Sequence, residues 1–255
     1  MRNYTQTGTT IYGIAITGLG LVHFFYPGFR PVFLPMPPQE KFTVLPLLFG
    51  LLLVNIGVGI IFIKEKKIIA EFLGIILLSF LLLGHLPNRL TNQPEILAYW
   101  TDTIKLFALI GGAFLIAGTT DNQQGIPTPK FAKIIGPIGL YMFCIMLVLF
   151  GTDHYLYFDF VRSLVPKWIP FTSFWTYGTG IALFGSGILI AINVWRTQVS
   201  LLLAIMLLLW LVLLHLPAWF AGPDKDAVNI VSSLECFAFS GIAMICSQYN
   251  VSKKT

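Results

Sequence analysis

Charged residues are scarce in this chain, and their scarcity excludes most soluble architectures. Lys, Arg, Asp and Glu make up 11% of the 255 residues, whereas 56% are apolar and the mean hydropathy is +0.80. A soluble domain could not bury that much apolar surface. The net charge is +5, but the basic residues are scattered between apolar runs and form no basic face, which argues against nucleic acid as a partner. The composition predicts an integral membrane protein whose surroundings are the lipid bilayer.

Cysteine is also rare. The three cysteines, at positions 144, 236 and 246, each lie in an apolar run, and no Cys-x-x-Cys occurs. This spacing argues against a disulfide framework and against thiol-disulfide exchange. The sequence also lacks a Gly-rich phosphate loop and a dinucleotide fingerprint. These absences leave open whether the protein is an enzyme.

Eight apolar runs are each long enough to cross a bilayer as a helix. A hydrocarbon core about 30 Å thick requires about 20 apolar helical residues. The predicted fold class is therefore an all-α polytopic membrane protein with eight transmembrane helices. The predicted spans are residues 9–26, 43–63, 68–86, 99–118, 134–152, 173–194, 198–216 and 227–247.

The chain repeats itself. The tetrapeptide Gly-His-Leu-Pro at 84–87 returns as Leu-His-Leu-Pro at 214–217, so His85 and His215 are 130 positions apart, and an offset of 131 pairs His23 with His154. The repeat predicts two four-helix units, residues 1–120 and 134–255, joined by a cytoplasmic linker at 121–133. Because four helices are an even number, both units should have the same orientation, which makes the repeat a parallel one.

The distribution of Lys and Arg predicts the orientation in the membrane. These residues are slightly more numerous on the side that carries both termini, which includes a basic turn at 64–67 and the basic tail. Both termini are therefore expected in the cytoplasm. The long connections 27–42 and 155–172 then lie outside, and the second alternates apolar and polar residues, which predicts a short interfacial helix that closes over the bundle.

Two segments resemble a known family. GLVHFFYPGF at 20–29, its counterpart GTDHYLYFDF at 151–160 and the Gly-rich fourth helices are similar to the DoxX-like (DoxX/DoxD) family of small bacterial membrane proteins, here in tandem duplication. The resemblance implies a four-helix fold, the bacterial inner membrane and a redox setting, since some members are associated with thiosulfate or thiol oxidation and quinone reduction. The second half departs from the motif, with Phe158 in place of Pro27.

All four histidines are expected at the outer ends of spans. An imidazole there could hydrogen-bond a quinone carbonyl, or ligate a metal or haem. Metal ligands usually come with carboxylates or thiolates, and only Asp153 adjoins a histidine, His154, so a metal or haem is the less favoured interpretation. The commonest role of such histidines is structural. Because Pro87 and Pro217 should end their helices, the carbonyls freed there could bind the neighbouring imidazoles.

Lys105 and Glu235 occupy equivalent positions inside the fourth and eighth spans. Charges within a span are costly and mark functional sites. The two residues could meet near the pseudo-two-fold axis as an ion pair that locks the halves together, and Asp102, one turn before Lys105, is a competing partner. A substrate or proton site, or a Lys105 side chain that extends to the interface, are the alternatives.

The favoured function is an accessory or quinone-associated membrane subunit with an outward-facing polar pocket, working with a protein partner in a membrane complex. A small-molecule transporter and a non-catalytic envelope assembly protein are the alternatives. The candidate pocket residues are His23, His85, His154, His215, Lys105, Glu235, Asp102 and Asp153.

Overall fold

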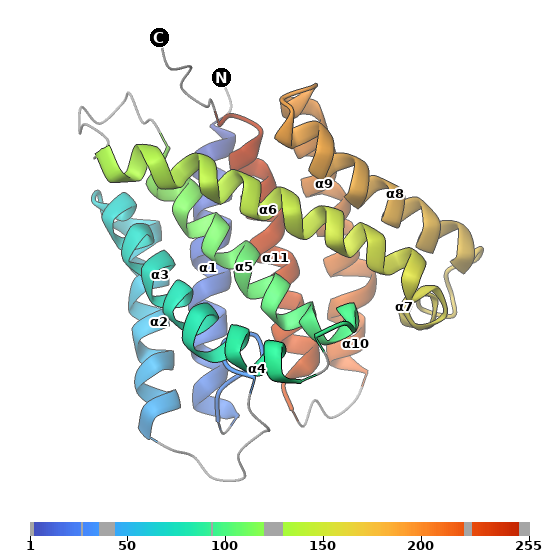
Figure 1. Cartoon of the computed structure of the whole chain (residues 1–255), viewed down its shortest axis with the longest axis horizontal. Coiled ribbons are helices and arrows are strands. Elements are labelled where there is room, and N and C mark those ends of the chain that lie inside the picture. The colour runs from blue at the N-terminus through green and yellow to red at the C-terminus, as the bar shows by residue number, and fades with distance from the viewer. Residues whose placement is uncertain are drawn as a thin grey trace.

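The structure is a computed structural model that describes residues 3–26, 28–35, 44–92, 94–119, 130–221 and 226–249. Within these ranges the chain contains helices and no strands, and the helices pack side by side in a bundle (Figure 1). Eight helical segments of the described chain are long and apolar enough to cross a membrane. The predicted fold class, an all-α polytopic membrane protein with eight spans, is confirmed.

The spans follow the predicted order. The first unit contains α1 (Tyr4–Phe25), α2 (Val44–Phe62), α3 (Lys66–Phe80) with η1 (Leu81–His85) and α4 (Leu86–Thr91), and η2 (Leu97–Trp100) with α5 (Thr101–Ala117). The second contains α6 (Lys130–Leu156) followed by α7 (Phe158–Leu164), then α8 (Thr172–Ala191), α9 (Arg196–Trp210) with η3 (Leu211–His215) and α10 (Leu216–Phe220), and α11 (Val228–Cys246).

The expectation that proline ends the third and seventh spans is wrong. Each of these two spans contains one turn of π-helix. The Leu86 amide donates to the Leu81 carbonyl in the third span, and the Leu216 amide donates to the Leu211 carbonyl in the seventh. The widened turn accommodates the proline that follows two positions after each π-helix ends, so the helices continue as α4 and α10. The two π-helices lie 130 positions apart, so the sequence repeat is also a repeat of this local distortion.

Most of the predicted linker 121–133 lies outside the described residues. Its last four positions belong to α6, which already begins at Lys130 and continues through an internal proline, Pro137. This helix therefore begins before residue 134, where the second unit is predicted to start.

The helices of the two units interlock. Around the bundle the order of contacts is α2, α1, α11, α9, α8, α6, α5, α3 and back to α2, and α5 also contacts α11 across the centre. The first helix of each unit thus packs on the fourth helix of the other unit: α1 packs on α11, and α6 packs on α5. This arrangement is the one expected for a repeat related by an axis between α5 and α11.

Glycines allow these two contacts between the units. A Cβ atom added to Gly241 of α11 would lie 2.7 Å from the carbonyl oxygen of Gly8 in α1. The equivalent crossing has the same geometry, with 2.7 Å between a Cβ atom at Gly111 of α5 and the carbonyl oxygen of Gly139 in α6. Backbones this close leave no room for a side chain, which is the usual basis of helix association in lipid.

The two ends of the bundle differ in character. Near the chain termini, the Thr5 amide donates to the Gln248 side chain at 2.9 Å, so α1 begins beside the end of α11. At the opposite end, which we call the histidine end, lie the last turns of α1 and α6 and both π-helices. The predicted interfacial helix is present as α7, but it packs mainly against α6 and α8 at the edge of the bundle rather than over its centre (Figure 1).

Candidate functional site

A cluster of three charges lies where α5 meets α11. The Lys105 Nζ is 2.9 Å from Oε2 of Glu235 and 3.5 Å from Oδ1 of Asp102. The ion pair anticipated between the two halves is therefore present, and Asp102 joins it instead of competing with it. Glu235 is 2% exposed, and its Oε1 has no hydrogen-bond partner within the described part of the chain. Two carboxylates face one ammonium, so the cluster keeps one uncompensated negative charge when both are ionised.

His85, at the end of η1, is completely buried and uses both ring nitrogens. Its Nε2 is 3.1 Å from the Val32 carbonyl oxygen, and its Nδ1 is 2.9 Å from the Thr103 hydroxyl. A carbonyl oxygen only accepts, so Nε2 carries the hydrogen, and in the neutral ring Nδ1 accepts from Thr103. No nitrogen lone pair is left for a metal, which makes His85 a structural residue that ties the segment 28–35 to the bundle.

The segment 28–35 is itself part of the core. Val32 and Phe33 are 1% and 0% exposed. Arg30, 2% exposed, donates from Nη1 to the Asp226 carbonyl at 3.0 Å and from Nη2 to the Gly28 carbonyl at 3.1 Å. The segment that follows α1 is therefore folded into the histidine end and bonded to the segment that precedes α11.

His23 is enclosed by aromatic rings. Its Nδ1 donates to the Leu19 carbonyl at 2.9 Å within α1, and the ring centroids of Phe33 and Phe49 are 5.8 and 5.6 Å away. Its Nε2 is buried and has no hydrogen-bond partner within the described ranges. Enclosure by phenylalanines leaves His23 without direct access to an aqueous ligand.

His154, the counterpart of His23, repeats its backbone bond but not its burial. Nδ1 donates to the Phe150 carbonyl at 2.7 Å, and the side chain is half-buried. Its neighbour Asp153 has a buried Oδ1 that lacks a hydrogen-bond partner among the described residues. Phe49, which closes the ring around His23, corresponds to Thr179 at the 130-residue offset, so the second unit lacks this aromatic wall.

His215, the counterpart of His85, is half-buried and makes no hydrogen bond within the described chain. Lys105 lies close enough to interact with it electrostatically. The residue equivalent to Thr103 is Ser233, whose hydroxyl donates instead to the Asn229 carbonyl of its own helix at 2.8 Å. His215 therefore lacks both interactions that fix His85.

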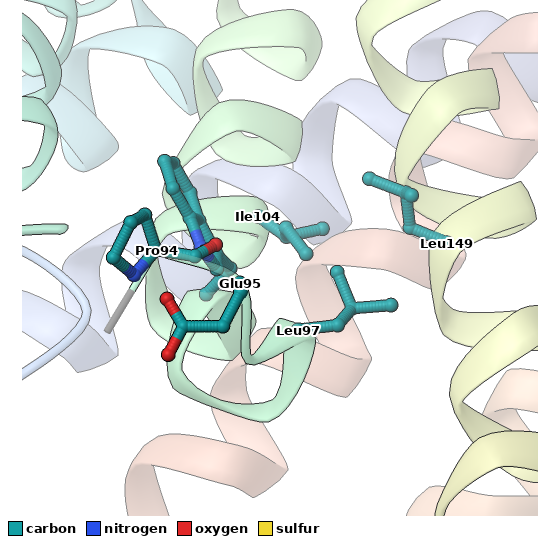
Figure 2. Close-up of a pocket in the computed structure, with 6 residues that line it drawn as sticks. Pro94, Glu95, Leu97, Ile104 and Leu149 are labelled. Carbon is teal, nitrogen blue, oxygen red and sulfur yellow. The ribbon is translucent and has the colours of Figure 1, made fainter. Parts of the chain in front are cut away.

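A pocket of about 290 Å³ opens between the start of α5 and the end of α6. Figure 2 shows Leu149 pointing from α6 toward Ile104 and Leu97, with the Glu95 carboxylate turned away at the rim. None of the eight candidate residues lines this pocket, and the predicted polar pocket between His23, His85, Lys105 and their repeat equivalents stays a prediction. Lys105 directly follows the pocket residue Ile104 in sequence, and Asp153 lies one turn beyond Leu149 on the same face of α6.

Sequence reasoning missed the partners that distinguish the four histidines. The inward fold of segment 28–35, with Val32 and Arg30, carried no clear signal except its apolar composition. Trp100, which lines the pocket and donates from its indole nitrogen to the Pro94 carbonyl at 2.9 Å, is not among the predicted site residues. Within the described chain no three His, Cys, Asp or Glu side chains are grouped as metal ligands usually are.

Comparison with known proteins found no matching family model, no similar curated protein and no similar solved structure.

Proposed function

We propose that this protein is a ligand-binding subunit of a bacterial membrane redox or envelope process, of the DoxX-like kind that its histidine motifs resemble. The observation that supports this most directly is the charge cluster between α5 and α11. A buried carboxylate with one oxygen unpartnered costs folding energy that a purely structural contact would avoid. A site that binds a proton or the polar group of a ligand makes use of that oxygen.

The position of the cluster supports a binding role at one face of the membrane. Lys105, Glu235, the two π-helices and the pocket beside Ile104 all belong to the half of the bundle that contains the histidine end. A quinone or another membrane-soluble molecule could reach this end from the lipid. A protein partner that supplies or receives electrons is part of the proposal.

The test is a strain that lacks the gene and is complemented with wild type, Glu235→Gln or Asp102→Asn. We expect Glu235→Gln to lower quinol-dependent oxygen uptake by membrane vesicles when the uptake is divided by the amount of this protein in the membrane. Asp159→Asn is the matched control, because Asp159 forms an ion pair with Arg162 on α7 but is 88% exposed. Wild-type oxygen uptake in the Glu235→Gln strain would contradict a redox role for the cluster.

A second candidate function is a small-molecule transporter, and the paired π-helices favour it. A π-helical turn often marks a functional site, and here one occurs at corresponding positions of two repeats, as the discontinuous helices of transporters do. Uptake of a substrate into proteoliposomes that depends on Glu235 would favour this function over the first.

We also propose that both termini lie in the cytoplasm. A reporter fused after Lys254 should therefore be active only on the cytoplasmic side.

A further inference from the structure

The two halves of the protein have equivalent helices but differ in what lies against the histidine that ends each π-helix. In the first half, a segment of the chain itself docks on the π-helix histidine: the Val32 carbonyl oxygen accepts a hydrogen bond from His85 Nε2 at 3.1 Å. The docked group is therefore a carbonyl, and it is carried by an apolar body, since Val32 and Phe33 are 1% and 0% exposed.

The second half presents an equivalent histidine in nearly the same backbone geometry. The φ and ψ angles are −69° and −52° at His85 and −71° and −46° at His215. Each residue ends a five-residue π-helix and precedes a Leu-Pro pair. His215 nevertheless makes no hydrogen bond within the described chain and is only half-buried.

The chain segment that could have filled this place lies elsewhere. The residues equivalent to Val32 and Phe33 at the 131-residue offset are Ser163 and Leu164 of α7. Leu164 is 58% exposed, and the Ser163 hydroxyl donates to the Phe160 carbonyl within α7. α7 packs mainly on α6 and α8 at the edge of the bundle (Figure 1) and makes no substantial contact with η3 or α10 in the described chain, so it does not dock on His215 as Val32 docks on His85.

We infer that the second half binds a membrane-soluble molecule that has a carbonyl group on an apolar body, and that its carbonyl oxygen accepts a hydrogen bond from His215. The molecule takes the place that Val32 and Phe33 occupy in the first half. This inference rests on the proposed function and assigns the ligand class and the residue that recognises it. Two kinds of membrane molecule carry such a carbonyl, a quinone ring and an acyl ester.

Lys105 and Glu235 complete the polar side of this site. Lys105 interacts electrostatically with His215 and is paired with Glu235, whose second oxygen has no partner among the described residues. The cluster contains one ammonium and two carboxylates, so its charges alone do not distinguish a carbonyl oxygen from an amine. The carbonyl assignment rests instead on the equivalence of His215 and His85.

The experiment uses the full-length protein in dodecyl maltoside, a detergent without a carbonyl group. Three probes are compared: ubiquinone-1, methyl laurate and, as a carbonyl-free control, dodecane. Binding is measured by equilibrium dialysis, and the hydrogen bond by the infrared stretching band of an isotope-labelled probe carbonyl, which shifts to lower wavenumber when the oxygen accepts a hydrogen bond. We expect saturable binding and a shifted band for ubiquinone-1 or methyl laurate, and neither for dodecane.

Substitutions at His215 and His154 identify the residue that donates the hydrogen bond to the probe. His215→Leu should weaken binding about tenfold, the effect of losing one hydrogen bond, and abolish the band shift. His215→Gln keeps an N–H donor and should retain the shift. His154→Leu is the matched control, because His154 is also half-buried at the histidine end but donates to its own helix; it should leave both measurements unchanged.

The outcomes separate the possibilities. Binding of ubiquinone-1 alone makes the ligand a quinone, and binding of methyl laurate alone makes it an acyl lipid; both support the inference. An unshifted carbonyl band in the wild type, equal binding of dodecane, or equal affinity in His215→Leu would overturn it. The wild-type band decides the matter even if a variant fails to fold. The complementation experiment on Glu235 is independent, so the proposed function can stand if this assignment falls.

Discussion

Lys105 lies between two carboxylates, and the energetics of this arrangement decide what a single substitution does. A buried ion pair contributes little net stability, because removing two charges from water costs about as much as their attraction returns. Removing Lys105 alone is different, since it leaves the Glu235 carboxylate buried and unpaired, whereas removing Glu235 leaves Lys105 with Asp102. The cluster should therefore tolerate the loss of both members better than the loss of Lys105 alone.

A double-mutant cycle tests this. Lys105→Met should lower the free energy of unfolding by about 3–5 kcal/mol, and Glu235→Gln by less because Lys105 keeps Asp102; the double variant should lose clearly less than the sum of the two. Unfolding by SDS in mixed micelles measures the change. The exposed pair Arg162 and Asp159 on α7 is the control, at about 0–1 kcal/mol. Additive losses for Lys105 and Glu235 would show that the pair is not an energetic unit.

The two π-helix histidines should respond differently to the same change. His85→Ala removes two hydrogen bonds and leaves the Val32 carbonyl and the Thr103 hydroxyl buried without partners, so we expect a loss of about 3 kcal/mol. His215→Ala should cost less than about 1 kcal/mol, because His215 makes no hydrogen bond within the described chain. The same SDS titration compares them, and equal losses would contradict the distinction between a structural and a ligand-binding histidine.

At the scale of helices, contacts between the two units depend on glycine. Gly241 of α11 and Gly111 of α5 each face a glycine carbonyl of the partner helix, whereas nothing lies within 4 Å of a Cβ atom added at Gly178 or Gly185 of α8. The same substitution therefore has opposite consequences at the two kinds of position. This contrast separates a packing effect from an effect of helix propensity.

Gly241→Ala should destabilise the protein by about 1–3 kcal/mol, because the backbones of α1 and α11 must separate. Gly178→Ala should be neutral or stabilise by up to about 1 kcal/mol, since alanine favours the helix more than glycine does. Thermal unfolding in detergent, followed by circular dichroism, provides the comparison. A harmless Gly241→Ala would mean that the α1 and α11 backbones are not in close contact.

The sequence predicted those elements that leave a pattern along the chain, such as a long apolar run or an internal repeat. Long apolar runs predicted eight spans, and the repeat of His85 as His215 predicted that the third and seventh spans are equivalent, but not that each contains a π-helix. The continuation of the helix past Pro87 was missed, because proline is a helix breaker unless the turn before it widens. The inward fold of Val32 was also missed, because it depends on one carbonyl meeting one imidazole, a tertiary contact without a local pattern.

At the scale of the whole molecule, the two units are not independent. α1 packs on α11 and α6 packs on α5, so each half separated from the other would expose the face of a glycine-lined helix. The sequence predicted the duplication and the charge pair that joins its halves. It could not predict that the first helices are exchanged, since the repeat pattern is the same whether each unit closes on itself or on its neighbour.

Residues 1–125 and 126–255 expressed separately should therefore fail to give stable protein, whereas their co-expression should give a complex that survives purification in mild detergent. Size-exclusion chromatography and limited proteolysis distinguish the two cases. A single half that purifies as a monodisperse, protease-resistant protein would contradict the interlocked arrangement.

The most direct test of a ligand site at the histidine end is mass spectrometry of the organic molecules extracted from protein purified in mild detergent, with His215→Leu and His154→Leu prepared in parallel. A molecule with a carbonyl group on an apolar body should accompany the wild type and His154→Leu in stoichiometric amount and be lost from His215→Leu. A well-folded wild type that carries no such molecule, or carries as much of it as His215→Leu does, would contradict the assignment.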